Sequence, residues 1–418
     1  MLLACPALLT TSLLQILAFA TASTVDKTPL RTIPRIEFEK ISTETTNYTW
    51  DDSPPKFKHK ASRITKRGSK WKEIRQYEAV EELTFVSWPS GTSESAREDD
   101  EELDYVFLNA AGSGVTVYVH DSGINLQHEE FTTSAPSGVQ KGTIELLYPK
   151  TGPGVTTEDL NAIKKAGDTD GHGTCVASKI VGQNWGVAKG ANLKFVPLID
   201  SGYDDTIQAG LKAIIEDIKK EREKNARYMA VVNLSYGLKE YDQTAKQRSE
   251  YLDLYKQIYD LDAVMVTTAG NYLASCDEPR EVNDYPALFV KELPNMIVVG
   301  SVDVDGSVSE ISKIGNLVSV YAPGAVNSRR GEGITCAWGN IEGSTEDEVK
   351  RGINRDQGTS FAAGIVSGLA AYLVSTDPES FRTGKVAEEV KAKILNLAWG
   401  RPKGKGFKSV WNGRDGFA

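Results

Sequence analysis

One histidine, His172, lies between Gly171 and Gly173 at the start of a run of small and apolar residues, DTDGHGTCVASKIV. An imidazole can take up and return a proton near neutral pH, so this residue type suits general acid–base chemistry. A histidine beside glycine is also an ordinary turn or helix-start residue. The segment alone therefore leaves a structural and a chemical role open.

Three other polar residues stand at the end of an apolar run or at the start of one. Asp121 follows GVTVYVH and offers a carboxylate able to orient an imidazole, while Asn271 follows DAVMVTTAG and carries an NH2 donor suited to an oxyanion. Ser360 precedes a long apolar run, where a helix N-terminus would help to stabilise negative charge near its hydroxyl. The structural alternatives are a turn for Asp121 and Asn271 and a helix cap for Ser360.

The elements that must position these residues indicate an α/β fold. Longer segments with helical spacing alternate with the expected strands, and the clearest of them runs from Asp204 to Lys224. The expected strands are short, β-branched and apolar, as in strands buried on both faces of a parallel sheet: GVTVYVH, NLKFVPLI, MAVVNLSY, DAVMVTTAG and NMIVVGS. In such sheets functional groups collect beyond the carboxyl ends of the strands, which is where Asp121 and Asn271 stand.

Composition limits the class of protein. The chain has 418 residues, of which 40% are hydrophobic and 25% charged, which is typical of a globular protein with one large domain and an extension. The formal net charge of -9 gives no basic footprint, so we expect no nucleic-acid partner.

The N-terminal region predicts export. Residues 1–22 are apolar and end in the small residues Ala20-Thr21-Ala22, which favours a cleaved secretory signal over the alternative of a membrane anchor. Residues 23–80 are polar and turn-rich, contain the basic pair Lys66-Arg67, and are predicted to be a pro-segment or linker. Asn47, in the sequon Asn-Tyr-Thr, is a predicted glycosylation site.

Six separated blocks together resemble the subtilisin-like (subtilase) serine endopeptidases, and more closely their secreted fungal proteinase K-like relatives. They occur in the family order between about Leu103 and Val374. The blocks are Asp121-Ser122-Gly123-Ile124, His172-Gly173-Thr174 with Val176-Ala177, Asn233-Leu234-Ser235-Tyr236-Gly237, Ala269-Gly270-Asn271, Tyr321-Ala322-Pro323-Gly324 and Gly358-Thr359-Ser360-Phe361-Ala362.

The resemblance implies a role for each candidate residue. Ser360 would attack a peptide carbonyl, His172 would relay its proton, and Asp121 would orient the imidazole. Asn271 would donate to the oxyanion, and the glycines beside His172 would keep the approach to its ring open. By the same resemblance, one wall of the primary specificity pocket would be formed by Ser235, Tyr236 and Gly237.

Several positions depart from the family pattern. Gly364 stands where proline is usual and is expected to loosen its helix, and Ser178 stands where glycine is usual. His120 replaces an aliphatic residue, and strand alternation predicts that it points away from Asp121.

Three cysteines remain if Cys5 leaves with the signal. The fold implied by the resemblance predicts a disulfide between Cys276 and Cys336, with Cys175 reduced and buried.

The sequence thus predicts a secreted serine endopeptidase of protein or peptide substrates, with residues 81–418 as the peptidase domain on a three-layer α/β/α sandwich with a mostly parallel sheet. We expect a monomer that needs no cofactor for the chemistry and contacts no membrane after signal removal; metal sites, including structural calcium, stay undecided. The alternative is a catalytically idle binding protein of the same fold. A lipase or esterase of the α/β-hydrolase type is disfavoured because no G-x-S-x-G precedes a helix.

Overall fold

The computed structural model of the chain describes residues 59–61, 71–90, 104–152, 155–198, 203–272, 279–325, 327–328, 331–401, 403–404 and 406–416. The expected signal segment, Asn47, Lys66-Arg67 and Cys276 lie outside these described residues.

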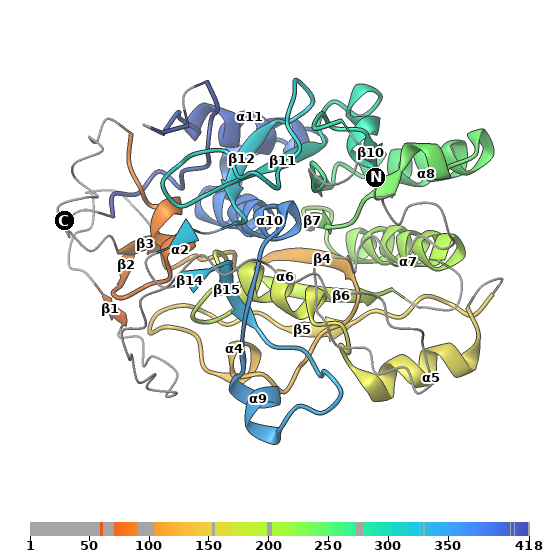
Figure 1. Ribbon diagram of the computed structural model, residues 1–418, viewed down its shortest axis with the longest axis horizontal. Helices are drawn as coiled ribbons and strands as arrows, with labels where there is room; N and C mark the ends of the chain where they lie inside the picture. The colour runs from red at the N-terminus through yellow and green to blue at the C-terminus, as the bar shows by residue number, and fades with distance from the viewer. Residues whose placement is uncertain are drawn as a thin grey trace, which may run out of the picture.

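A seven-stranded sheet passes through the molecule, and all of its neighbouring strands are parallel (Figure 1). In spatial order the strands are β12 (Val320–Pro323), β11 (Ile297–Val302), β9 (Val264–Thr268), β7 (Met229–Leu234), β4 (Val115–Asp121), β6 (Asn192–Pro197) and β5 (Ile144–Leu146). Every residue of β4, β9, β11 and β12 is buried, which explains their unbroken apolar, β-branched composition. The five apolar runs expected to be strands are β4, β6, β7, β9 and β11.

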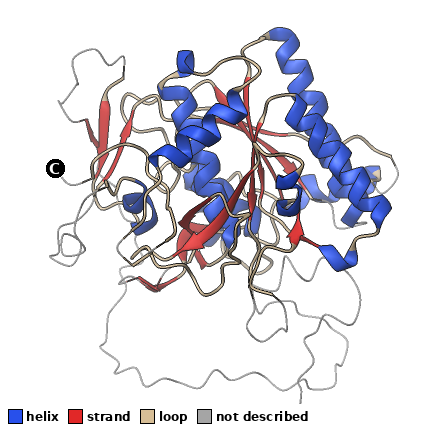
Figure 2. Cartoon of the chain, turned by 90° about the horizontal axis from the view of Figure 1, so that it is seen from above, coloured by secondary structure: helices blue, strands red, loops and turns tan. Residues whose placement is uncertain are grey.

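Helices cover both faces of the sheet (Figure 2). One face packs against α7 (Tyr203–Lys224) and α8 (Ala245–Asp260), and the other against α6 (His172–Val181), α10 (Thr359–Thr376) and α11 (Val386–Leu397). Val117 and Tyr118 are adjacent in β4 yet belong to opposite cores, because successive strand side chains point to opposite faces. The predicted three-layer α/β/α architecture is confirmed.

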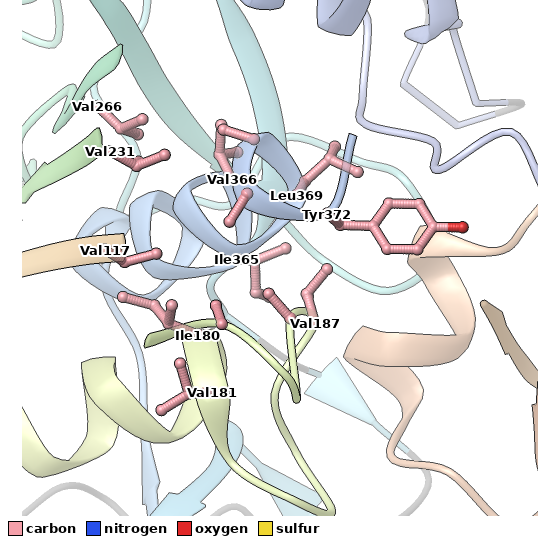
Figure 3. Close-up of a cluster of buried hydrophobic side chains, with 14 of the residues drawn as sticks. Val117, Ile180, Val181, Val187, Val231, Val266, Ile365, Val366, Leu369 and Tyr372 are labelled. Carbon is pink, nitrogen blue, oxygen red and sulfur yellow. The ribbon is translucent and has the colours of Figure 1, made fainter. Parts of the chain in front are cut away.

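Helix α10 fills the core on its face of the sheet, between the strands and α6 (Figure 3). Its length and mean hydropathy of 1.4 would suit a membrane span, but 94% of it is buried inside the molecule, so it is a core helix. Gly364 and Gly368 lie where α10 meets α6: a Cβ on Gly364 would lie 3.2 Å from the carbonyl oxygen of Val176, and one on Gly368 would lie 2.9 Å from Cβ of Val187. The departure at Gly364 therefore permits close helix packing.

The described N-terminal residues form part of the same core. A three-stranded antiparallel sheet contains β1 (His59–Ala61), β2 (Glu73–Gln76) and β3 (Tyr105–Leu108), and α2 (Glu81–Val86) follows β2. The indole of Trp71 donates to the carbonyl of Thr376 at 2.9 Å. Ile74, Ala79 and Val80 are also buried in the main core, so part of the segment 23–80, predicted to be a pro-segment or linker, packs with the residues that follow it.

The remaining elements are short and lie around the sheet. They are α4 (Glu129–Thr132), α5 (Thr157–Ala166), β8 (Leu238–Lys239), η2 (Glu240–Asp242), β10 (Asp284–Tyr285), η3 (Ala287–Lys291), β13 (Asn327–Ser328), β14 (Gly331–Glu332), β15 (Ile334–Ala337), α9 (Glu346–Arg351), β16 (Ile353–Asp356) and η4 (Pro378–Ser380). The pair β15 and β16 forms an antiparallel hairpin that encloses α9 and leads into α10.

The cysteine prediction was wrong. Cys175 of α6 forms a disulfide with Cys336 of β15, so Cys175 is not reduced and Cys336 is not available to Cys276. Cys175 is buried as expected, but its helix face packs against the hairpin, with the two Cα atoms 4.8 Å apart. This distance lies within the range that a disulfide requires.

The same face of α6 holds the hairpin by polar contacts. The Ser178 hydroxyl accepts a hydrogen bond from the backbone N–H of Ala337 at 3.2 Å, which gives a purpose to the departure from glycine. Lys179, one residue further, pairs with Glu82 at 2.8 Å, and the same Glu82 oxygen accepts from the N–H of Thr335. Positions 175, 178 and 179 are neighbours on a helix surface, so one face of α6 packs against β15 and α2.

Candidate active site

The chain brings the predicted residues to the carboxyl edge of the parallel sheet. Asp121 is the last residue of β4, Ser235 directly follows β7, and Asn271 lies three residues beyond β9. His172 is the first residue of α6, and Ser360 is the second residue of α10. This edge is where parallel sheets gather functional groups.

Asp121 and His172 are in direct contact. Oδ1 of Asp121 lies 2.7 Å from Nδ1 of His172, and both residues are buried. The same oxygen accepts from the backbone N–H of Ser122 at 2.7 Å, which fixes the carboxylate. This hydrogen bond places the proton on Nδ1 and leaves Nε2 as the nitrogen free for proton transfer.

The glycines beside His172 are required by the backbone. Gly171 has φ of +92°, in the left-handed region where a side chain is strained. A Cβ on Gly173 would lie 2.3 Å from the carbonyl oxygen of Gly123 and 2.7 Å from the ring of Phe195. The two glycines thus let α6 start close against the end of β4, a reason that the sequence did not suggest.

Three carboxylates raise the pKa of His172. Burial lowers this pKa, but the charge and hydrogen bond of Asp121, together with the charges of Asp170 and Asp356, outweigh burial and raise it to about 9. Asp170 also accepts from the backbone N–H of His172 at 3.1 Å. Burial is the main cause that raises the pKa of Asp170 and of Asp356 to about 6 each.

Sequence reasoning missed Asp170 and Asp356. Asp170 stands two residues before His172 and could have been found as a second carboxylate in the same block. Asp356 is the last residue of β16, and the fold of the hairpin brings its charge near the imidazole, which no local sequence pattern reveals.

Ser360 lies at the same site but does not hydrogen-bond to His172 in this structure. Its hydroxyl donates to the carbonyl oxygen of Ser235 at 3.0 Å. The next residue, Phe361, places its ring 5.3 Å from the imidazole, so the start of α10 borders His172. The hydroxyl must give up this hydrogen bond before it can donate to Nε2; catalytic hydrogen bonds are often loose or absent before substrate binds.

Asn271 is oriented by Thr359. Its Oδ1 accepts from the backbone N–H of Thr359 at 3.0 Å and from the Thr359 hydroxyl at 2.8 Å. With the oxygen held in this way, Nδ2 lies beside Gly358, 3.5 Å from the position that a Cβ would take there. The amide donor therefore lies next to the residues that precede Ser360.

The segment from Ser235 to Gly237 borders Ser360 through its backbone. The Ser235 hydroxyl lies 2.9 Å from both Oδ1 of Asn233 and the carbonyl oxygen of Ser360. The side chain of Tyr236 is buried on the far side, where its hydroxyl is 3.3 Å from Nδ1 of His120 and 3.1 Å from the hydroxyl of Tyr255. Tyr236 thus offers only its backbone to this site.

His120 points away from Asp121, as strand alternation predicts. It is fully buried, and burial lowers its pKa to about 4. Asn233, which begins the sequence Asn-Leu-Ser, is buried as well, and its Nδ2 donates to the Ser367 hydroxyl of α10 at 3.0 Å.

Among the residues that the structure describes, no group of three or more His, Cys, Asp or Glu side chains gathers in a way that could hold a metal ion.

Comparisons with known proteins agree on one family. A model of the subtilase family matches residues 112–417. The chain is 31% identical over 299 residues to the subtilisin-like protease 2 of Trichophyton rubrum, covering 71% of this chain and 57% of that protein. It is 26% identical over 306 residues to a cuticle-degrading serine protease of Arthrobotrys oligospora, covering 73% and 62%.

A solved structure of a cold-adapted subtilisin-like serine proteinase is also similar, with 24% identity, a TM-score of 0.48, and coverage of 72% of this chain and 89% of that one. This chain spans less than two thirds of the length of the two fungal relatives.

Proposed function

Because the chain belongs to the subtilase family, we propose that it is a serine endopeptidase that hydrolyses peptide bonds in proteins through an acyl-enzyme. The observation that carries this proposal is the buried 2.7 Å contact between Asp121 and His172 at the edge where Ser360 stands. The whole-protein activity of relatives named as proteases supports it, although this chain matches only part of their length.

In the proposed reaction, the Ser360 hydroxyl leaves the Ser235 carbonyl and turns to Nε2 of His172. As Oγ attacks the peptide carbonyl carbon, the hydroxyl proton passes to His172, and Asp121 stabilises the resulting imidazolium. The proton then moves to the leaving amine, which departs and leaves an ester on Ser360. A water molecule, deprotonated by the same imidazole, hydrolyses the ester and restores the hydroxyl.

The oxyanion that forms during attack needs donors aimed at it. We assign this role to Nδ2 of Asn271 and the backbone N–H of Ser360. The hold of Thr359 on Oδ1 supports the first assignment, because the amide is oriented before substrate arrives. The N-terminus of α10 adds positive potential at the same place.

Secretion is part of the proposal. The disulfide between Cys175 and Cys336 suits an oxidising compartment, as does the apolar N-terminal segment of residues 1–22. Glycosylation at Asn47, residues 23–80 as a pro-segment or linker, a monomeric state and catalysis without a cofactor remain predictions. Protein or peptide substrates are expected, with backbone contacts to Ser235, Tyr236 and Gly237.

An active-site fluorophosphonate tests the proposal directly. A serine hydroxyl reacts selectively only beside a base and an oxyanion hole, so a single label is expected, at Ser360. Ser360→Ala, His172→Ala and Asp121→Ala should each lower peptide hydrolysis by several orders of magnitude, and the losses should not add. If the folded, fully processed protein takes up no label, a catalytically idle binding protein becomes the better account.

A further inference from the structure

Two segments leave the sheet side by side next to Ser360. Leu234 of β7 lies beside Thr267 of β9, so residues 235–237 and 269–271 continue from the same edge. The first segment accepts a hydrogen bond from the Ser360 hydroxyl, and the second accepts two from Thr359. Both segments therefore border the start of α10, and if Ser360 attacks a substrate carbonyl, the side chain next to that carbonyl lies close to the space between them.

Asp284 lies between the segments. Strand β10 pairs with β8 and sets Asp284 opposite Lys239, just after Gly237. A Cβ on Gly237 would lie 3.4 Å from Cβ of Asp284, and one on Gly270 would lie 2.6 Å from its Oδ2. Each segment thus has a glycine where it faces this carboxylate, and any larger residue at 270 would collide with it.

A buried charge cluster surrounds Asp284. Its Oδ2 pairs at 2.8 Å with Nζ of Lys313, whose side chain is fully buried and also donates to Asn283. Its Oδ1 lies 3.5 Å from Nζ of Lys239 and is buried without a hydrogen-bond partner. The N–H of Lys313 donates to the carbonyl of Gly270, which fastens the cluster to the second segment.

We propose that Asp284 is a specificity-determining residue that closes the space between the two segments and restricts cleavage to bonds that follow short, uncharged side chains. This inference rests on the proposed function. A Leu or Phe side chain of the substrate would displace the remaining polar contacts of the buried ion pair between Asp284 and Lys313, which costs free energy. A Lys side chain would meet two ammonium groups against one carboxylate.

Five fluorogenic peptides that differ only in the residue before the scissile bond test the proposal on the unmodified protein. With Ala, Ser, Leu, Phe and Lys at that position, kcat/KM is expected to be at least tenfold higher for Ala and Ser than for the other three. A preference for Leu or Phe over Ala would overturn the proposal without any variant being made.

The double variant Asp284→Ala with Lys313→Met replaces the ion pair by apolar side chains, so neither partner is left as an unpaired buried charge. It should raise the ratio of kcat/KM for Phe to that for Ala by at least tenfold. Asp284→Asn keeps the shape of the side chain, so it should weaken the discrimination against Leu less than the double variant does. The matched control is Arg75→Met with Asp104→Ala. It removes a buried 2.9 Å ion pair between residues that belong to neither segment, and it should leave the ratio of kcat/KM for Phe to that for Ala unchanged.

Labelling of Ser360 by the fluorophosphonate separates two kinds of failure. A protein that labels normally and cleaves all five peptides alike overturns the role of Asp284 alone. A protein that neither labels nor cleaves overturns the proposed function and this inference with it. An unchanged ratio in the double variant, with normal labelling, also overturns the role of Asp284.

Discussion

Cys175 and Cys336 are bonded across 161 positions of sequence, and their bond ties the helix that starts at His172 to the hairpin that ends four residues before Ser360. The proposed base therefore begins one of the two linked elements, and the proposed nucleophile follows the other by four residues. Ser178 and Lys179 reinforce the link on the same helix face.

Replacing both cysteines by alanine should lower the free energy of unfolding substantially. In the chain-entropy account, a closed loop of this length contributes about 5 kcal/mol. Urea denaturation of the double variant beside the parent checks the size of the loss, and reduction of the unfolded parent should remove the difference between them. Disulfide mapping that joins Cys336 to Cys276 instead would contradict the structure.

The pH dependence of hydrolysis should reflect the raised pKa of His172. The base must be unprotonated to act, so kcat/KM should rise with pH and level off near pH 9 rather than near 6.5. The sign for stability is the opposite: because the folded-state pKa is raised, the charged imidazole stabilises the fold below pH 6.5, and this contribution is lost as the pH rises to about 9.

Asp170→Asn and Asp356→Asn should each shift the rising limb of the pH profile to lower pH, because each removes a negative charge near His172. Profiles of kcat/KM for the two variants check this. Glu348→Gln, a substitution in exposed helix α9, is the control and should leave the profile in place. A limb that stays fixed in both aspartate variants would show that their charges do not reach the imidazole.

Asn271→Asp should lower kcat by about 10²–10³-fold with little change in KM, the loss typical of removing one oxyanion donor. The new carboxylate can still accept from Thr359, so the local fold is kept while the NH2 donor is lost. Thr359→Val removes the hydroxyl that orients the amide and should cost a smaller factor in kcat. Equal kcat in Asn271→Asp and the parent would remove Asn271 from the oxyanion site.

Gly368→Ala and Gly364→Ala should differ in stability. At Gly368 the added methyl would lie 2.9 Å from Cβ of Val187, and such overpacking costs about 1–3 kcal/mol. At Gly364 the tightest contact is 3.2 Å, and the better helix propensity of alanine, about 1 kcal/mol, offsets much of it. Urea midpoints of the two variants give the comparison, and a more stable Gly368→Ala would contradict the close packing of α6 and α10.

Local patterns predicted the strands, because burial on both faces leaves a plain apolar run. They also singled out Asp121 and Asn271 after two of these strands, and His172 and Ser360 at the start of small-residue or apolar runs that form helices. The cysteine pairing was out of reach for the same reason that Asp356 was: both depend on how a hairpin of residues 334–356 folds back on α6. Asp284 was missed because the pairing of β8 with β10 joins residues 45 positions apart in register, from Lys239 to Asp284. Burial of the Tyr236 side chain could not be predicted either, because the family block gives the position of the residue in the sequence but not the direction of its side chain.

The position of α10 in the chain has a consequence for biosynthesis. The helix that fills one face of the sheet is made from residues 359–376, after every strand of that sheet. Until it emerges from the ribosome, the apolar face of β4, β7 and β9 lacks the helix that fills its core. The carbonyl of Thr376, which accepts from the indole of Trp71 at a separation of 305 residues, is also still missing. Such late, long-range closure favours slow folding and exposes a surface prone to aggregation. The nascent chain therefore needs protection from aggregation until α10 has been made.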